Sequence, residues 1–144
     1  MINKHFSLHN RVGVPMNLNQ ITLPVKNIEE SIRFYINLGF ELIVDTPHYA
    51  RFSCPEGDAT FSLSVTEQKF NNGAVIYFEL ETLDQYVKKL QKQGFNFAQL
   101  PTDQRYLWRE AILFDPDNNQ LKFYWAGENR LNPPWKVKHN RRAT

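Results

Sequence analysis

The chain has 144 residues, of which 42% are apolar and 14% aromatic, and its formal net charge is only +2. A single domain of this length buries roughly 68–70% of the surface of its unfolded chain, so a complete hydrophobic core is expected. The single cysteine, Cys54, excludes a disulfide framework and a cysteine-rich zinc site within one chain. No long apolar run or charged-then-apolar leader stands out, so we expect a soluble, cytoplasmic protein with no membrane span.

Residues 1–15, MINKHFSLHNRVGVP, show no apolar periodicity and end in a proline just before a second methionine, Met16. We predict an N-terminal arm here that carries no chemistry. Regular patterning begins after Met16, so the domain is expected to start there.

The first regular stretch, LNQITLPVKNIEESIRFYINLGF, ends at Phe40 and combines an alternating strand with a helix. The helix is predicted from apolar residues at helical spacing, which are Ile28, Ile32, Tyr35 and Ile36. Gly39 follows at the position where a left-handed backbone conformation caps a helix, which glycine adopts readily because it has no Cβ to clash. Three further strands are predicted, at about 41–45, 48–54 and 59–65.

The stretch AVIYFELETLDQYVKKLQKQGF, which ends at Phe95, repeats this pattern. When Gly94 is aligned with Gly39, the apolar positions of the two strands and the two helices coincide. The second helix is predicted from Leu83, Tyr86, Val87 and Leu90, and three strands should follow at about 96–100, 106–114 and 119–125. The sequence therefore predicts an α+β fold in which a βαβββ unit is used twice, over about 16–66 and 73–126. An unrelated α+β sandwich is the alternative.

Residues 127–144 are expected to form a C-terminal extension. The segment Asn129–Trp135 contains two prolines and ends in an aromatic anchor. It could fold back over a pocket or lie across a dimer interface, but we favour packing against the domain. The end of the chain carries four cations, Lys136, Lys138, Arg141 and Arg142, and is expected to be solvated rather than to bind nucleic acid.

Strand alternation sorts the predicted strands into two faces, because successive side chains point to opposite sides. The apolar face, expected beneath the helices, contains Ile21, Leu23, Val25, Phe61, Leu63, Val65, Ile76, Phe78, Leu80, Leu121, Phe123 and Trp125. The polar face contains Gln20, Thr22, Thr60, Ser62, Ser64, Tyr77, Glu79, Trp108, Glu110, Gln120, Lys122 and Tyr124. If two such sheets curl together, the polar face lines a cavity for a small ligand; otherwise it faces water.

The repeated unit, the phrase LPVKNIEESIRFYINLGF and the hairpin AILFDPDNNQLKF together resemble the vicinal-oxygen-chelate superfamily. That superfamily includes glyoxalase I, extradiol dioxygenases, and fosfomycin- and bleomycin-resistance proteins. The resemblance covers about residues 16–126, and the region from YLWREAILFDPDNN to AGENRLNPPWKV is similar to a bacterial glyoxalase-like subgroup. It implies two βαβββ modules that form a curved, partly closed mixed sheet around a cavity, with the helices outside. It also implies a homodimer.

The resemblance places the superfamily's four metal-binding positions on Gln20, on or near Ser62, on Val75 and on Lys122. Of these, only the Gln20 amide could coordinate a metal, and amide oxygens are weak ligands. Valine has no donor atom, and the charge of lysine opposes a nearby dication. None of the four histidines falls on the polar face. Since a catalytic transition-metal site usually takes three imidazole or carboxylate ligands from the protein, we expect no metal and no cofactor.

Lys122 is the most informative departure from the superfamily's pattern. Its ammonium could replace the charge of the metal and attract an acidic or carbonyl-bearing ligand. Lys122 should also form an ion pair with Glu79 or Glu110, since burying a lysine without a partner is costly. The alternative is that the Lys122 side chain extends to the pocket rim and keeps its charge in water. On this view, Lys122→Met should weaken binding of an acidic ligand with little loss of fold.

Trp108 can wall a pocket, and Glu110 can orient a ligand or act as a catalytic base. Arg109 should point the other way and clamp the helix layer or a partner chain, and Cys54 has no histidine fixed beside it to make it a nucleophile. The residues predicted to contact a ligand are Gln20, Thr22, Ser62, Tyr77, Glu79, Trp108, Glu110, Lys122 and Tyr124.

Three functions are compatible with this pattern. The first is a metal-independent protein that binds or sequesters a small molecule, in the manner of the bleomycin-resistance branch. The second is a lyase, isomerase or dioxygenase-type enzyme that uses a carboxylate base such as Glu110 or a relocated metal. The third is a non-catalytic interaction module.

Overall fold

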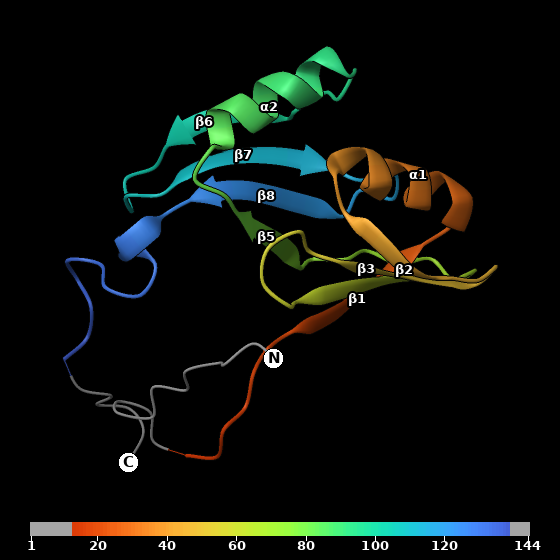
Figure 1. The fold of residues 1–144 in the computed structure, drawn as a ribbon, viewed down its shortest axis with the longest axis horizontal. Coiled ribbons are helices and arrows are strands. Elements are labelled where there is room, and N and C mark those ends of the chain that lie inside the picture. The colour runs from red at the N-terminus through yellow and green to blue at the C-terminus, as the bar shows by residue number, and fades with distance from the viewer. Residues whose placement is uncertain (1–12, 139–144) are drawn as a thin grey trace.

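The computed structural model describes residues 13–138, in which two βαβββ modules follow one another as predicted (Figure 1). The first module consists of β1 (Gln20–Val25), α1 (Ile28–Leu38), β2 (Glu41–Asp45), β3 (Tyr49–Ser53) and β4 (Thr60–Val65). The second consists of β5 (Val75–Glu79), α2 (Leu83–Lys92), β6 (Gln99–Asp103), β7 (Arg109–Phe114) and β8 (Gln120–Trp125). A short 3-10 helix, Gly127–Asn129, begins the extension. Most of the predicted arm, along with Arg141 and Arg142, lies outside the described residues.

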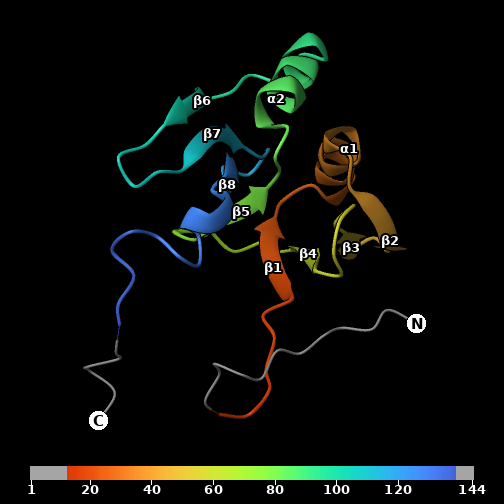
Figure 2. The same ribbon diagram turned by 60° about the vertical axis from the view of Figure 1, so that its left-hand side comes forward.

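Each module forms its own four-stranded mixed sheet, with strand orders β1-β4-β3-β2 and β5-β8-β7-β6. The first strand of each module runs parallel to the last, and the other neighbours are antiparallel. The sheets are not closed into a barrel, and both helices cover the same side of the pair (Figure 2). The α+β architecture predicted from the repeat is therefore confirmed.

The two sheets have corresponding hydrogen-bonding registers. In the first, Thr22 lies opposite Ser62, and in the second Tyr77 lies opposite Lys122. Ser62 and Lys122 are therefore counterparts in the two modules. This equivalence determines which side chains occupy matching places on the two sheets.

The core lies between the sheets and the helices. A cluster of aromatic rings packs at its centre, made of Tyr35, Phe40, Phe52, Phe61 and Phe78. The α1 helix begins at the Asn27 cap and ends at Gly39, whose φ of 111° favours glycine. Two residues of the predicted core, Ile21 and Trp125, remain 37% and 38% exposed, because they lie near strand ends.

The strand predicted at 96–100 is wrong by about three residues, since β6 runs from Gln99 to Asp103. A tight turn sets this limit: the Gln104 amide donates to the Trp108 carbonyl at 2.7 Å, and Leu107 adopts a left-handed φ of 67°. Because of the same turn, β7 begins at Arg109, about three residues after the predicted start at 106. Pro101 is tolerated because β6 is an edge strand with a register shift.

The turn sequence DPDNN between β7 and β8 ties the second module to the first. Its Asp115 carboxylate is buried and accepts a hydrogen bond from the Tyr35 hydroxyl of α1 at 2.7 Å. The Asn119 amide donates to Asp115 at 2.8 Å and to the Pro24 carbonyl of β1 at 3.2 Å. Burial, reinforced by the Asp115 charge, raises the pKa of Tyr35 well above its ordinary value. These bonds fix how the two modules sit against each other.

Candidate functional site

The face of each sheet opposite the helices, here called the inner face, carries most of the predicted ligand contacts. Its most constrained pair is Glu110 and Lys122, on neighbouring strands β7 and β8. The Lys122 Nζ lies 3.1 Å from Glu110 Oε2, and the Tyr106 hydroxyl donates to Glu110 Oε1 at 2.8 Å. Glu110 is only 2% exposed. Lys122 therefore pairs with Glu110, one of the two predicted partners.

The Lys122 side chain is 17% exposed, so it does not extend freely to solvent as the alternative required. Its ammonium lies 5.5 Å from the centroid of the Tyr77 ring. Burial lowers the pKa of Lys122, but the hydrogen bond and charge of Glu110 more than reverse this, and the pKa rises overall. The lysine is thus held charged at neutral pH, with its charge matched by a buried carboxylate.

Three aromatic side chains pack beside this pair. The Trp108 and Tyr124 rings stack with centroids 4.6 Å apart, and Tyr77 meets both edge-on at 6.0 and 5.5 Å. The indole nitrogen of Trp108 donates to the Asn129 carbonyl at 3.3 Å. Since Trp108 is bonded at its edge and stacked on one face, its orientation is fixed before any ligand arrives.

An open pocket of about 350 Å³ lies between these rings and the C-terminal extension. It is lined by Tyr77, Tyr106, Trp108, Glu110, Asn129, Arg130, Pro133 and Trp135. The extension therefore folds back over the inner face, which combines two of the arrangements considered from the sequence. Tyr106 and the extension were not among the predicted ligand contacts, because their position depends on the turn before β7 and on the path beyond β8.

Glu79 holds the extension in place. Its Oε2 accepts hydrogen bonds from the backbone amides of Ala126 and Gly127 at 3.0 and 3.1 Å. Its Oε1 lies 3.5 Å from Arg130 Nε. These contacts give Glu79 a structural role at the edge of the pocket, while its contact with a ligand stays a prediction.

Of the nine predicted contacts, three line this pocket: Tyr77, Trp108 and Glu110. Glu79, Lys122 and Tyr124 lie beside it, and Gln20, Thr22 and Ser62 lie on the inner face of the first module. The Gln20 amide donates to Ser62 Oγ at 2.5 Å, and the Tyr49 hydroxyl lies 2.5 Å from the same oxygen. Arg51 Nε donates to the Tyr49 hydroxyl at 2.9 Å. Tyr49 and Arg51 were missed in the sequence, although alternation along the predicted strand 48–54 could have placed both beside Ser62.

The four positions that the resemblance assigns to a metal do not fit a divalent ion. Gln20 and Ser62 are bonded to each other, Val75 has no donor, and Lys122 is a cation paired with Glu110. Within residues 13–138, no three His, Cys, Asp or Glu side chains are grouped so that they could hold a metal ion. An ammonium group occupies the place where the chemistry of a metal site requires a lone pair.

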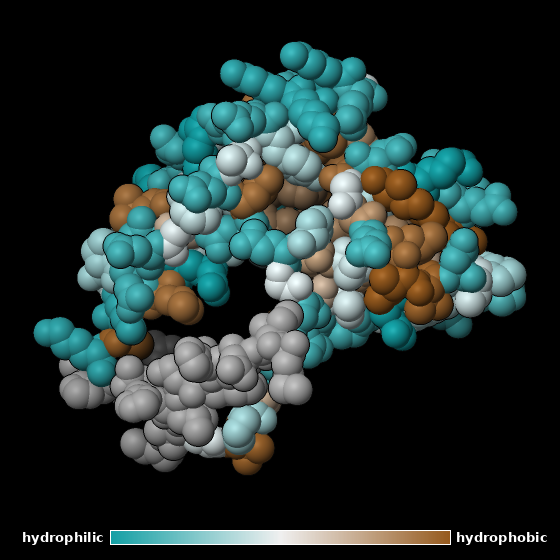
Figure 3. All heavy atoms as spheres, viewed as in Figure 1, coloured by the Kyte–Doolittle hydropathy of each residue, from teal (hydrophilic) through white to brown (hydrophobic). Residues whose placement is uncertain are grey.

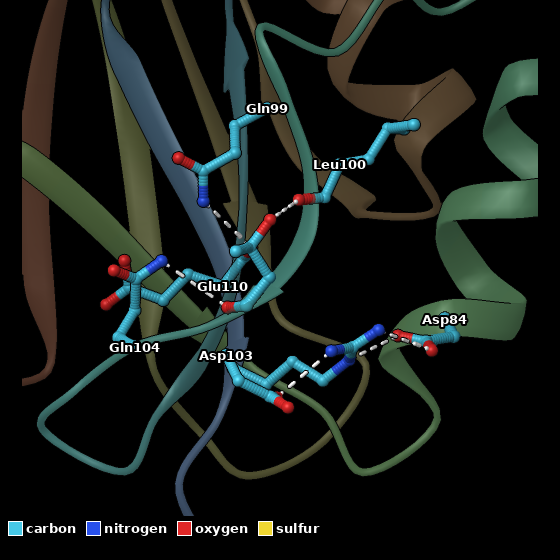
Figure 4. Close-up of polar contacts among 8 residues, drawn as sticks. Asp84, Gln99, Leu100, Asp103, Gln104 and Glu110 are labelled. Carbon is cyan, nitrogen blue, oxygen red and sulfur yellow. Dashed lines mark hydrogen bonds and ion pairs between the residues drawn. The ribbon is translucent and has the colours of Figure 1, made fainter.

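Arg109 points to the helix side, as predicted, and clamps α2 to the strands. Figure 4 shows the two carboxylates that it joins, Asp84 on α2 and Asp103 at the end of β6. It donates to both carboxylate oxygens of Asp84 at 2.9 and 3.0 Å and to Asp103 at 3.0 Å. The hydrogen bond from Arg109 lowers the pKa of Asp84. On the inner face, the side-chain amide of Gln99 on β6 donates to the Glu110 carbonyl of β7 at 3.2 Å, which fixes the backbone that carries Glu110.

A second hollow of about 320 Å³ lies between β1 and β5, and Cys54 is one of its lining residues. Burial raises the pKa of the Cys54 thiol, which disfavours the nucleophilic thiolate.

Among the described residues, no helix is both long enough and apolar enough to span a membrane.

Comparison with known proteins matches residues 17–123 to the sequence model of the Glyoxalase/Bleomycin resistance protein/Dioxygenase superfamily. An uncharacterized protein of Mycolicibacterium smegmatis is 28% identical over 109 residues, covering 74% of this chain and 91% of that protein. A glyoxalase/bleomycin resistance protein/dioxygenase from Nocardioides has a TM-score of 0.68 at 19% identity, with 90% of this chain and 93% of that one covered. A bleomycin-binding protein in complex with bleomycin has a TM-score of 0.63 at 17% identity, with coverages of 76% and 98%. At these identities, the two solved structures are similar to this chain in fold alone.

Proposed function

Because the chain belongs to the glyoxalase/bleomycin resistance protein/dioxygenase superfamily, we propose that it binds a small molecule without a metal, in the pocket of the second module. The observation that carries the proposal is the pocket itself: aromatic side chains of the sheet and of the extension border an open space of about 350 Å³. Pockets that bind small molecules are concave, largely apolar and supplied with a few placed polar groups. The bleomycin-binding protein of similar fold is a precedent for ligand binding on this architecture.

The pocket favours a flat molecule that carries no full charge. Tyr77, Trp108 and Trp135 offer ring surfaces, and the buried Glu110 is balanced by Lys122. The sequence favoured an acidic ligand because of the charge of Lys122, but the Glu110 carboxylate, 3.1 Å away, matches that charge. A ligand carbonyl can instead accept from the Asn129 side-chain amide at the pocket wall, and a ligand N–H or O–H group can donate to the Tyr106 oxygen, whose own proton is bonded to Glu110.

A screen of flat aromatic carbonyl compounds by thermal shift tests the proposal. At about 100 times its dissociation constant, a ligand is expected to stabilise the protein by about 2.7 kcal/mol and to raise Tm by about 8 °C. Trp108→Ala should weaken binding of such a ligand by about tenfold or more, because it removes one of the two indole rings of the pocket wall. Trp125→Ala is the matched control, since Trp125 lies on β8 but does not line the pocket. Equal affinities for the two variants, or the lack of any stabilising compound, would reject the proposal.

An enzymatic role is the second candidate, and the position of Glu110 favours it. This carboxylate borders the pocket and bonds to the Tyr106 hydroxyl, an arrangement that can relay a proton to or from a ligand. A lyase or isomerase of this kind should turn over a compound found in the screen. Loss of turnover in Glu110→Gln with retained ligand affinity would establish it, whereas binding without turnover leaves the first proposal in place.

We further propose a homodimer, in which the apolar surface over α1 and β2 is one candidate interface (Figure 3). Ile36 and Ile43, on these two elements, are 45% and 48% exposed. Light scattering should give twice the chain mass of 17.0 kDa, and Ile43→Lys should shift the protein toward the monomer. A monomer mass for the unaltered protein would reject the dimer, and an unshifted variant would place its interface elsewhere.

A further inference from the structure

The inner face of the first module carries a cation that no carboxylate neutralises within the described part of the chain. Arg51 makes a hydrogen bond through Nε to Tyr49, and none of the ion pairs among residues 13–138 involves it. A guanidinium has five N–H donors, so four remain for other partners. The contrast with Lys122, whose charge is matched by Glu110, makes Arg51 the stronger attractor of negative charge on the two inner faces.

The hydroxyl beside Arg51 is arranged to donate its proton. Ser62 Oγ accepts from Gln20 at 2.5 Å and lies 2.5 Å from the Tyr49 oxygen, and either of these two hydroxyls can donate to the other. When Ser62 donates, the Tyr49 oxygen accepts from both Ser62 and Arg51 Nε, and the Tyr49 proton is available for a third group. The hydrogen bond to Ser62, with a smaller contribution from Arg51, lowers the pKa of Tyr49, as expected for a hydroxyl that is a strong donor.

The register of the strands shows that this cluster corresponds to the Glu110–Lys122 pair. Tyr49 lies opposite Ser64 in the first sheet, as Glu110 lies opposite Tyr124 in the second. Ser62 and Lys122 each lie two residues before those partners. The place of the Glu110–Lys122 ion pair is therefore taken in the first module by the hydroxyl groups of Tyr49 and Ser62, and the charge of Arg51, which lies opposite Ser62, is beside them.

We propose that Arg51 and Tyr49, with Ser64 beside them, bind a small oxyanion such as a carboxylate or a phosphate group on the inner face of the first sheet. Arg51 supplies the charge and its free N–H groups, and Tyr49 donates one charge-assisted hydrogen bond. Ser64, which is directly opposite Tyr49 and half-buried, adds a second hydroxyl. This site lies outside the pocket of the second module and does not depend on what that pocket binds.

Titration of the full-length, ¹⁵N-labelled protein with inorganic phosphate and, separately, with acetate at low ionic strength tests the site. Saturable shifts are expected in the amide signals of residues 49–51 and 62–64. Arg51→Gln should weaken binding about tenfold or more, since it removes charge-assisted hydrogen bonds, and Tyr49→Phe should weaken it several-fold. Saturation by both probes indicates a general oxyanion site, and saturation by one identifies the anion that it takes.

The matched control is Arg33→Gln, which removes the same charge from an exposed position on α1. Non-saturable shifts with both anions, or equal phosphate affinity in Arg51→Gln and Arg33→Gln, would overturn the proposal. Trp108→Ala should bind phosphate as the unaltered protein does. This separates a failure of the anion site from a failure of the aromatic pocket.

Discussion

Lys122→Met is expected to lower the free energy of unfolding by about 3 kcal/mol, the lower end of the cost of breaking a buried ion pair. The reason is that Glu110 is 2% exposed and would lose the ammonium group that lies 3.1 Å from its carboxylate. The value lies at the lower end because Glu110 retains its hydrogen bond from Tyr106 and Lys122 is partly exposed. Urea denaturation with an unchanged m-value is the measurement. This replaces the expectation from the sequence that the substitution would leave the fold almost intact.

The double variant Lys122→Met/Glu110→Gln is the control, because it removes both charges and keeps a similar side-chain volume. It should recover most of the lost stability, since a buried pair replaced as a whole is often nearly neutral. A single variant as stable as the unaltered protein would show that the pair is solvated. A double variant no better than the single one would show that packing, not charge, is responsible.

Asp115→Ala should destabilise the protein by about 4 kcal/mol or more, because it leaves four donors without an acceptor and each such donor costs about 1–3 kcal/mol. The Tyr35 hydroxyl and the Asn119 side chain both donate to Asp115, and the backbone amides of Asp117 and Asn119 do so at 2.9 Å. Asp115 is 4% exposed, so water cannot easily replace it. The free energy of unfolding again measures the effect.

Asp117→Ala is the matched comparison in the same turn. Asp117 accepts from the Lys26 amide at 3.1 Å, lies closer to solvent, and should cost about 1 kcal/mol. Tyr35→Phe should cost about 1.5–3 kcal/mol, since it removes one bond to the charged carboxylate and leaves the others. If Asp115→Ala costs no more than Asp117→Ala, the turn does not hold the modules together.

The sequence predicted the fold well because both signals it relies on are local. Alternation along a strand and apolar spacing along a helix are written in neighbouring residues, and Gly39 marks the end of α1 directly. The strand β6 was misplaced because a left-handed Leu107 determines where the turn closes, and no pattern in the sequence marks a non-glycine residue for that conformation.

The candidate site was predicted less completely because it depends on pairing between strands. That Lys122 should meet a carboxylate followed from the cost of burying its charge, but the choice between Glu79 and Glu110 is settled by the register of β7 against β8. Arg51 and Tyr49 lie on the correct face of a correctly predicted strand. Their importance is visible only once Arg51 and Ser62 are seen to bond to Tyr49, with Ser62 in turn bonded to Gln20.

The way in which Glu79 holds the C-terminal extension has an evolutionary consequence. Its two hydrogen bonds go to main-chain amides, so the attachment at residues 126 and 127 does not depend on the side chains that follow. Residues 129–135 can then accumulate substitutions while the segment stays anchored beside the sheet. Related chains could acquire new ligand preferences by exchanging this short stretch, with the scaffold beneath it left untouched.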